Sequence, residues 1–243
     1  VLLKVDSYQD FLICWSITNL LSFIIYYLII KLRWNENIVY LNIGLAYKEI
    51  KYSWQFAFAK MLTAIYTSLG AAIIGTFSIS GAGAFLIADQ IYRAGQSLYN
   101  PVFQAAYPIY AQNKNLSEYL AMVKKMSIVV FAFALLLFFL SNQIISFLYG
   151  ENIISIALLK IFSVILIINF AGVSCGYNIF AIIDKLEYTN RTVITGSLLY
   201  CLILSLLVTF NSLNEVNLVI SILATELFVA LYRFVLFTEE RND

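Results

Sequence analysis

The sequence contains no histidine and only 3 cysteines among its 243 residues. Because histidine is the commonest general base, proton shuttle and metal ligand at neutral pH, hydrolase triads that use it are excluded. Cys14, Cys175 and Cys201 lie in apolar runs and form no CxxC pair. Neither a disulfide framework nor a metal site is therefore indicated, and no cofactor is predicted.

Charged residues are also scarce, at 12% of the sequence, whereas hydrophobic residues make up 62%. This leaves too little polar surface to cover a soluble globule of this length, which argues against a water-soluble enzyme. The formal net charge of +1 is not gathered in a basic patch. A nucleic-acid partner is therefore not predicted.

The few charges are separated by long apolar stretches. About 20 predominantly apolar residues cross the hydrocarbon of a bilayer as an α-helix. The predicted spans are residues 11–30, 54–79, 83–110, 123–148, 153–182, 192–211 and 217–237. Because a helix satisfies its own backbone hydrogen bonds in lipid, we predict an all-α, polytopic transmembrane helix bundle.

Lysine and arginine are found in alternate connections between these spans. They occur after residue 30, after residue 110, after residue 183 and in the C-terminal tail. The connections at 80–82, 149–153 and 211–217 contain neither. By the positive-inside rule, the basic connections and the C-terminus are predicted to be cytoplasmic.

The longest predicted connection, residues 31–53, is the main candidate for a domain boundary. Ile38, Leu41 and Leu45 at near-helical spacing are typical of an interfacial helix, and a solvated loop is equally compatible with the pattern. The chain starts with Val1 and not with methionine, so we interpret it as part of a longer protein.

Residues 81–112 contain both prolines of the chain and two opposite charges within a predicted span. Asp89 and Arg93 are four residues apart, so they lie one turn apart on the same helix face and can form an ion pair. Pro101 and Pro108 each remove a backbone hydrogen bond and predict a kinked helix. Broken helices in membranes usually line a cavity.

Four elements of this segment recur in a known family. They are Ala88–Asp89, Arg93, Asn100–Pro101 and Ala106–Tyr107–Pro108. The segment resembles the second helix of the C-terminal lobe in polysaccharide flippases of the O-antigen (Wzx) type, within the multidrug/oligosaccharidyl-lipid/polysaccharide exporter superfamily. Further similar elements are Tyr66–Thr67, Ile74–Phe77, Ile168–Phe170 and Gly176–Asn178. The resemblance covers about residues 54–191, and the chain departs from it at Ala71 and Ala72, where many members carry an acidic residue.

The resemblance implies a two-lobe exporter fold of twelve helices, with a central cavity that opens alternately to the two sides of the membrane. Residues 1–30 would end the N-terminal lobe, residues 31–53 would connect the lobes, and residues 54–237 would form the C-terminal lobe, followed by a cytoplasmic tail at 238–243. The resemblance further implies that the chain is not an enzyme but part of a flippase of the bacterial inner membrane, which would move an undecaprenyl-diphosphate-linked oligosaccharide from the cytoplasmic to the periplasmic leaflet.

The implied substrate is an O-antigen repeat unit of lipopolysaccharide, or the repeat unit of another surface polysaccharide. Expected partners are this lipid-linked oligosaccharide, membrane lipid, the missing N-terminal lobe and other polysaccharide-assembly proteins.

A flippase for such a substrate needs cationic groups within the membrane to meet the diphosphate. Apart from residues taken as span ends, such as Lys124, Lys125 and Arg233, the charged residues inside the predicted spans are Lys60, Asp89, Arg93, Lys160 and Glu226. Arg93, Lys60 and Lys160 are the candidate substrate-binding cations, because a guanidinium grips phosphate at two points and an ammonium acts as a point charge. Structural pairing of Arg93 with Asp89, and snorkelling of the two lysines, are the alternatives.

Asp89 and Glu226 are candidates for charge pairing or ion coupling. Glu226 lies at a depth that matches Lys160, so it is expected either to pair with that lysine or to take up a proton. Tyr66 and Tyr92, together with Tyr99 and Tyr107, are candidate sugar-stacking residues of the cavity. Most aromatic residues in such a chain, however, serve packing or the interface belts.

Three functional classes remain open on the sequence. A flippase for lipid-linked oligosaccharide comes first, a multidrug or toxin antiporter of the same exporter fold second, and a membrane glycan polymerase third. The antiporter predicts fewer cationic groups and an acidic cation site, and the polymerase predicts a large external loop that the short connections do not provide. The cations inside the spans favour the flippase.

Overall fold

The computed structural model describes residues 8–34, 69–150 and 152–242, together with single residues at positions 44, 47, 50, 53, 54, 57 and 61. The chain divides into two compact units, Val1–Ser53 and Trp54–Asp243. Every regular element in the described ranges is a helix, which confirms the predicted all-α fold.

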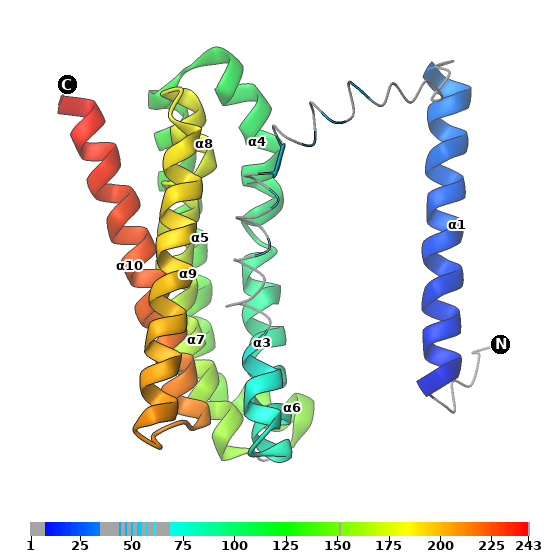
Figure 1. Ribbon diagram of the computed structural model, residues 1–243, viewed down its shortest axis with the longest axis vertical. Coiled ribbons are helices and arrows are strands. Elements are labelled where there is room, and N and C mark those ends of the chain that lie inside the picture. The colour runs from blue at the N-terminus through cyan, green and yellow to red at the C-terminus, as the bar shows by residue number, and fades with distance from the viewer. Residues whose placement is uncertain are drawn as a thin grey trace. The chain divides into compact units, whose positions relative to one another are not determined.

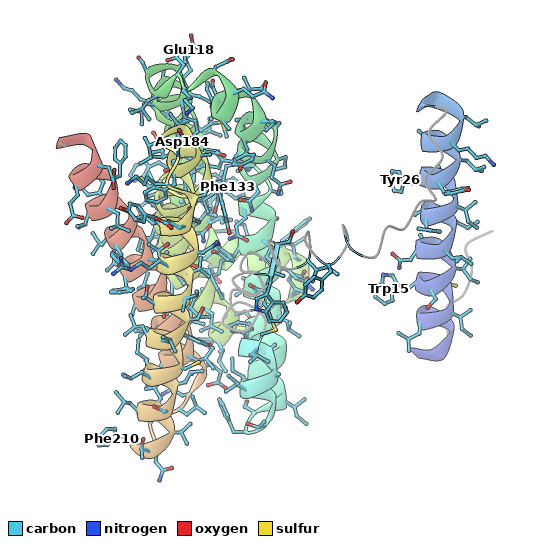
Figure 2. All side chains as sticks on the ribbon, turned by 45° about the horizontal axis from the view of Figure 1, so that its top comes forward. Trp15, Tyr26, Glu118, Phe133, Asp184 and Phe210 are labelled. Atoms are coloured by element: carbon cyan, nitrogen blue, oxygen red, sulfur yellow. The ribbon has the colours of Figure 1, made fainter. Side chains whose placement is uncertain are left out.

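The first unit contains the long helix α1 (Tyr8–Trp34). At about 1.5 Å per residue its 27 residues extend roughly 40 Å, enough to cross a bilayer. Its described apolar side chains are mostly exposed, among them Trp15 and Tyr26, which point outward in Figure 2. A helix that is apolar on every side is suited to lipid, and the predicted span at 11–30 lies within it.

The second unit is an antiparallel bundle, drawn from cyan to red in Figure 1. Its labelled helices are α3 (Ile79–Gln96), α4 (Asn100–Asn113), α5 (Leu116–Phe139), α6 (Ser141–Tyr149), α7 (Ile153–Ser174), α8 (Tyr177–Ile182), α9 (Leu186–Thr209) and α10 (Glu215–Asn242). Helix α7 is central, because it contacts α3, α5, α6, α8 and α10. Its core-forming side chains include Leu158, Phe162, Ile165, Leu166 and Phe170.

In the described part of the chain, 5 segments are long and apolar enough to cross a membrane. They are Leu12–Ile29, Leu116–Phe139, Ile153–Ile182, Leu186–Thr209 and Glu215–Glu240. The chain is therefore a polytopic helical membrane protein. The predicted span at 83–110 is broken into α3 and α4, and neither helix qualifies alone. The predicted span at 54–79 and the connection at 31–53 lie largely outside the described residues.

Short polar side chains define where several helices begin. The Oγ of Ser78 accepts from the backbone N–H of Gly81 at the start of α3, and Asn152 and Asn214 make equivalent bonds at the starts of α7 and α10. These side chains satisfy backbone donors that a helix leaves unpaired at its N-terminus. Asn115 does the same for α5 at the opposite end of the bundle.

The basic connections of the second unit lie together at one end. Lys114, after α4, forms an ion pair with Asp184, which lies between α8 and α9. Lys185 pairs with Glu240 near the end of α10 at 3.2 Å, and the hydrogen bond and charge of Glu240 raise the pKa of Lys185. The predicted sorting of charges by connection therefore matches the geometry of the bundle.

The connections without lysine or arginine lie at the other end. Tyr149 of α6 and Gln90 of α3 form a hydrogen bond of 3.2 Å, with the tyrosine hydroxyl as donor. A Cβ atom added to Gly81 would collide with the carboxylate of Glu215, which places the first turns of α3 and α10 in contact. Figure 2 shows Asp184 near one end of the bundle and Phe210 at the opposite end.

Candidate functional site

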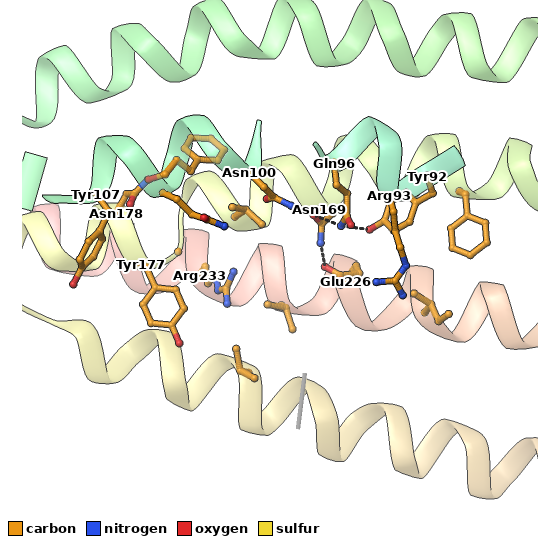
Figure 3. Close-up of a pocket in the computed structure, with 18 of the residues that line it drawn as sticks. Tyr92, Arg93, Gln96, Asn100, Tyr107, Asn169, Tyr177, Asn178, Glu226 and Arg233 are labelled. Atoms are coloured by element: carbon orange, nitrogen blue, oxygen red, sulfur yellow. Dashed lines mark hydrogen bonds between the residues drawn. The ribbon is translucent and has the colours of Figure 1, made fainter. Parts of the chain in front are cut away.

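A cavity of about 750 Å³ lies within the second unit. Side chains from α3, α4, α7, α9 and α10 and from the α7–α8 corner form its wall (Figure 3). Its charged lining residues are Asp89, Arg93, Glu226 and Arg233. Amide side chains lie between them, namely Gln96, Asn100, Gln104, Asn169 and Asn178. The cavity therefore offers charge, hydrogen-bond donors and hydrogen-bond acceptors inside an otherwise apolar bundle.

Asp89 and Arg93 form a close ion pair on the cavity face of α3. The Nε of Arg93 donates to Oδ2 of Asp89 at 2.6 Å, as the four-residue spacing predicts. The Asp89 side chain is 11% exposed, whereas that of Arg93 is 48% exposed. The carboxylate thus holds one edge of the guanidinium while the rest of this group extends toward the cavity.

The break between α3 and α4 follows one turn after this pair. Helix α3 ends at Gln96, and α4 begins at Asn100 with Pro101 in its first turn. Proline suits the first turn of a helix, because it has no N–H to place there. Pro108 lies inside α4, and Lys114, which directly follows this helix, is in the left-handed region at φ 49°. The kink predicted from Pro101 is therefore a complete interruption of the helix.

A polar network crosses the cavity wall next to this break. The Oδ1 of Asn169 accepts from Tyr99 Oη at 2.6 Å and from Gln96 Nε2 at 3.1 Å. The Nδ2 of the same amide donates to Oε2 of Glu226 at 3.0 Å. Gln96 Nε2 also lies 2.9 Å from the hydroxyl of Tyr92. These bonds connect α3, α7 and α10, as Figure 3 shows for Gln96, Asn169 and Glu226.

Arg233 also lines the cavity, although its position near the predicted end of the last span indicates a charge at the membrane surface. It is 8% exposed. Its Nε donates to Thr192 Oγ1 of α9 at 3.0 Å, and its Nη1 donates to the carbonyl of Gly172 on α7 at 2.7 Å. A Cβ atom on Gly176 would lie 3.1 Å from Nη1, so a glycine at this corner lets the guanidinium approach the backbone.

A sequence signal for Arg233 does exist. It follows Glu226 by seven residues, which is two helical turns, so both project from one face of α10. Val229 lies between them on this face and also lines the cavity. The position of Arg233 on the same helix face as Glu226 therefore predicts its place in the cavity better than its distance from the predicted end of the span does.

Of the other candidate binding residues, one lines the cavity, one faces away from it and two lie outside the described part of the chain. Tyr92 lines the cavity, and its ring stacks on Phe162 with the centroids 5.1 Å apart. Lys160 is exposed, and at 3.6 residues per turn it lies roughly 160° around α7 from Phe162, on the face opposite the cavity. Lys60 and Tyr66 lie outside the described residues.

The chemistry of the cavity follows from its groups. Two guanidiniums can each hold phosphate or carboxylate oxygens at two points. Amides both donate to and accept from hydroxyl groups, and the partly exposed rings of Tyr107 and Tyr177 provide flat apolar surfaces. Asp89 and Glu226 balance the formal charge of Arg93 and Arg233, which lowers the cost of placing these groups within a membrane.

Comparison with known proteins gives one family match. Residues 2–114 match the family described as polysaccharide biosynthesis protein. The matched stretch includes α1, α3 and α4, and hence Asp89, Arg93 and both prolines. No curated protein and no solved structure gave a match. The match supports a place for the chain among the membrane proteins of polysaccharide biosynthesis.

Proposed function

We propose that the protein is a flippase of the O-antigen (Wzx) type, which moves an undecaprenyl-diphosphate-linked oligosaccharide between the leaflets of a membrane. The family match of residues 2–114 and the polytopic helical fold support this assignment. The observation that carries it is a half-exposed guanidinium, Arg93, on the wall of a polar cavity in a membrane bundle. Such a group meets the charge of a diphosphate that cannot cross hydrocarbon unaided.

Two parts of the substrate require different surroundings. The diphosphate carries negative charge, for which Arg93 supplies a two-point donor held in place by Asp89. The oligosaccharide is rich in hydroxyl groups, for which Gln104 and Asn100 supply donors and acceptors from α4. Tyr92 is buried and stacked on Phe162, so the partly exposed rings of Tyr107 and Tyr177 are better placed to pack against a sugar. Translocation in this scheme forms and breaks no covalent bond.

The proposed flippase also has a direction of transport, a second lobe and groups for ion coupling. The basic end of the bundle is assigned to the cytoplasm by the positive-inside rule, so transport runs from the cytoplasmic to the periplasmic leaflet of a bacterial inner membrane. An N-terminal lobe supplies the opposite wall of the cavity. Asp89 and Glu226 are the candidate groups for coupling transport to an ion or proton, because they are the carboxylates that line the cavity.

The decisive experiment neutralises the cavity ion pair in the full-length protein. Asp89→Asn with Arg93→Gln removes both charges and keeps hydrogen-bonding capacity, so neither charge is left unpaired. We expect normal abundance in the membrane and loss of surface polysaccharide in a flippase-deficient strain. Lys114→Gln with Asp184→Asn is the matched control, since it removes an ion pair outside the cavity. Normal polysaccharide export by the Asp89/Arg93 double variant would refute the phosphate-binding role.

A multidrug antiporter is the second candidate, and the two buried carboxylates of the cavity favour it. Asp89 is 8% exposed and Glu226 is 5% exposed, and carboxylates in such positions bind organic cations in a cavity. The same double variant separates the two functions. For an antiporter, expression of the wild-type protein raises resistance to lipophilic cations, and the variant loses this resistance while surface polysaccharide is unaffected.

A further inference from the structure

Backbone hydrogen bonding is weaker at the break between α3 and α4 than within either helix. Leu98 N bonds to Gly95 O at 3.1 Å and Tyr99 N bonds to Gln96 O at 3.2 Å, both over three residues instead of the four of an α-helix. Such bonds have poorer geometry than α-helical ones. Pro101 has no N–H, so it cannot donate to the carbonyl of Ser97. Local hydrogen bonding alone therefore holds α4 only loosely against α3, as expected of a hinge.

Side chains on both sides of the break converge on one amide. Gln96 is the last residue of α3, and Tyr99 directly precedes α4. Both donate to Oδ1 of Asn169 on α7. Tyr99 is fully buried, and its ring also packs edge-to-face on Phe170 at 5.3 Å. The position of α4 relative to α3 is thus fixed through a residue of the central helix.

The orientation of the Asn169 amide is determined by its neighbours. Its oxygen faces two donors, and its nitrogen donates to the carboxylate of Glu226. A reversed amide would place its oxygen against the carboxylate of Glu226, which only accepts, whereas the hydroxyl of Tyr99 and the amide of Gln96 can each donate or accept. Glu226 therefore sets the direction of the amide that holds the break.

These bonds lie on the wall of the cavity and not in the closed core. Gln96, Asn169 and Glu226 all line the cavity of about 750 Å³. A ligand or water in the cavity can compete for their donors and acceptors, whereas the equally short bond from Tyr119 Oη to Ser174 O is fully buried. We propose that Asn169 is a positioning residue, which couples Glu226 of α10 to the α3–α4 break and must release the break when the cavity changes shape.

We call Gln96, Tyr99, Asn169 and Glu226 the Asn169 network. The inference rests on the proposed transport function only to explain why α4 moves relative to α3. The movement itself can be measured without a substrate. Loss of one hydrogen bond of ordinary strength changes the ratio of two conformations by about fivefold. A population shift of this size is visible in a distance distribution.

The experiment measures the distance across the break in the full-length protein in lipid nanodiscs. Spin labels are attached at Gly83→Cys on α3 and Asn113→Cys near the end of α4, in a background without the natural cysteines. Gly83 is suitable because nothing lies within 4 Å of an added Cβ, and Asn113 is exposed. Double electron–electron resonance then reports the populations of α3–α4 distances.

We expect one main distance for the wild-type network and a second population after Asn169→Leu or Tyr99→Phe. Tyr119→Phe is the matched control, because it also removes a 2.6 Å bond from a fully buried hydroxyl, away from the break. It should leave the distribution unchanged. An unchanged distribution in Asn169→Leu and Tyr99→Phe, or an equal broadening in Tyr119→Phe, would overturn the proposal.

An exchange of the two polar groups provides a rescue. Asn169→Asp alone places two carboxylates together and is expected to broaden the distribution. Adding Glu226→Gln restores a donor opposite an acceptor with the same total charge, so the single distance should return. Failure of the double variant to restore it counts against a direct coupling of Asn169 and Glu226.

The results of the distance measurements on the Asn169 network can be distinguished from the results of the export assay that tests the proposed function. A restored distance distribution with lost polysaccharide export means that the network is correct and that the carboxylate is needed at position 226 itself. Conversely, if the Asp89/Arg93 double variant abolishes export while the network variants leave the distance unchanged, the flippase assignment stands and the role of Asn169 is wrong.

Discussion

Arg233 is expected to stabilise the fold through a bond that joins two helices. Its Nε donates to Oγ1 of Thr192, and the hydroxyl of Thr192 donates in turn to the carbonyl of Thr189. Arg233 is 8% exposed and Thr192 is fully buried. Thr192→Val removes the acceptor and preserves the shape of the side chain, so the guanidinium loses a partner at a site that water reaches poorly.

The size of the effect follows from the charge of the donor. A hydrogen bond to a charged group contributes about 1.5–3 kcal/mol, so Thr192→Val should lower the free energy of unfolding by about 2 kcal/mol. Arg233→Lys keeps the charge but replaces the planar fork by a single ammonium, which removes the same bond at a similar or larger cost. In the double variant this bond is lost once, so the two changes together should cost about 1–2 kcal/mol less than their sum.

The assay is thermal unfolding in detergent, followed by the fraction of protein that remains monodisperse on size-exclusion chromatography. Thr195→Val serves as the control, because the hydroxyl of Thr195 bonds to carbonyls of its own helix at Arg191 and Thr192. It should change stability by less than about 0.5 kcal/mol. Additive effects of Thr192→Val and Arg233→Lys, or an equal cost for Thr195→Val, would refute the reasoning.

Two further predictions concern packing and topology. Gly196→Ala should destabilise the protein by about 1–3 kcal/mol in the same thermal assay, because its Cβ would lie 2.4 Å from Cγ2 of the rigid Val229, whereas Gly83→Ala meets open space and should be neutral or stabilising. Asn211→Cys should react with a membrane-impermeant maleimide in intact cells and Glu187→Cys should not, since both are exposed but at opposite ends of the bundle. The reverse labelling pattern would contradict the assigned orientation.

The helical class and the approximate positions of the spans are the part of the fold that the sequence predicts well, although α3, α5 and α9 begin at Ile79, Leu116 and Leu186, before their predicted spans. Charge-free stretches of sufficient length identify the spans. These signals are local, because they depend on residues within one helix or one turn. The Asp89–Arg93 contact is local in the same sense.

The rotation of each helix about its axis is less predictable. Helix α7 is apolar on nearly every side, so its pattern does not indicate which face meets the cavity. Lys160 and Glu226 were matched by depth alone, yet Lys160 is exposed and Glu226 is 5% exposed and bonded to Asn169. In membrane helices, which face is buried depends on packing against neighbours and not on an amphipathic pattern.

Contacts between residues that are distant in sequence account for the features of the site that the sequence does not predict. Asn169 meets Tyr99, Gln96 and Glu226 across separations of 70, 73 and 57 residues, respectively. No local spacing encodes these approaches. Arg233 was treated as a terminal charge because the last span was predicted to end at 237, whereas α10 continues to Asn242 and leaves Arg233 well inside the helix.

The order of charges along α3 and α10 gives the cavity a direction. Both helices begin at the end of the bundle without lysine or arginine, and on each the carboxylate precedes the arginine. At about 1.5 Å per residue, Arg93 lies about 6 Å beyond Asp89, and Arg233 about 10 Å beyond Glu226, toward the basic end. If that end is cytoplasmic, as the positive-inside rule predicts, the guanidiniums lie on the side from which the lipid-linked diphosphate of the proposed function would enter. The carboxylates would then lie on the side of release, where their charge would oppose that of the departing phosphate.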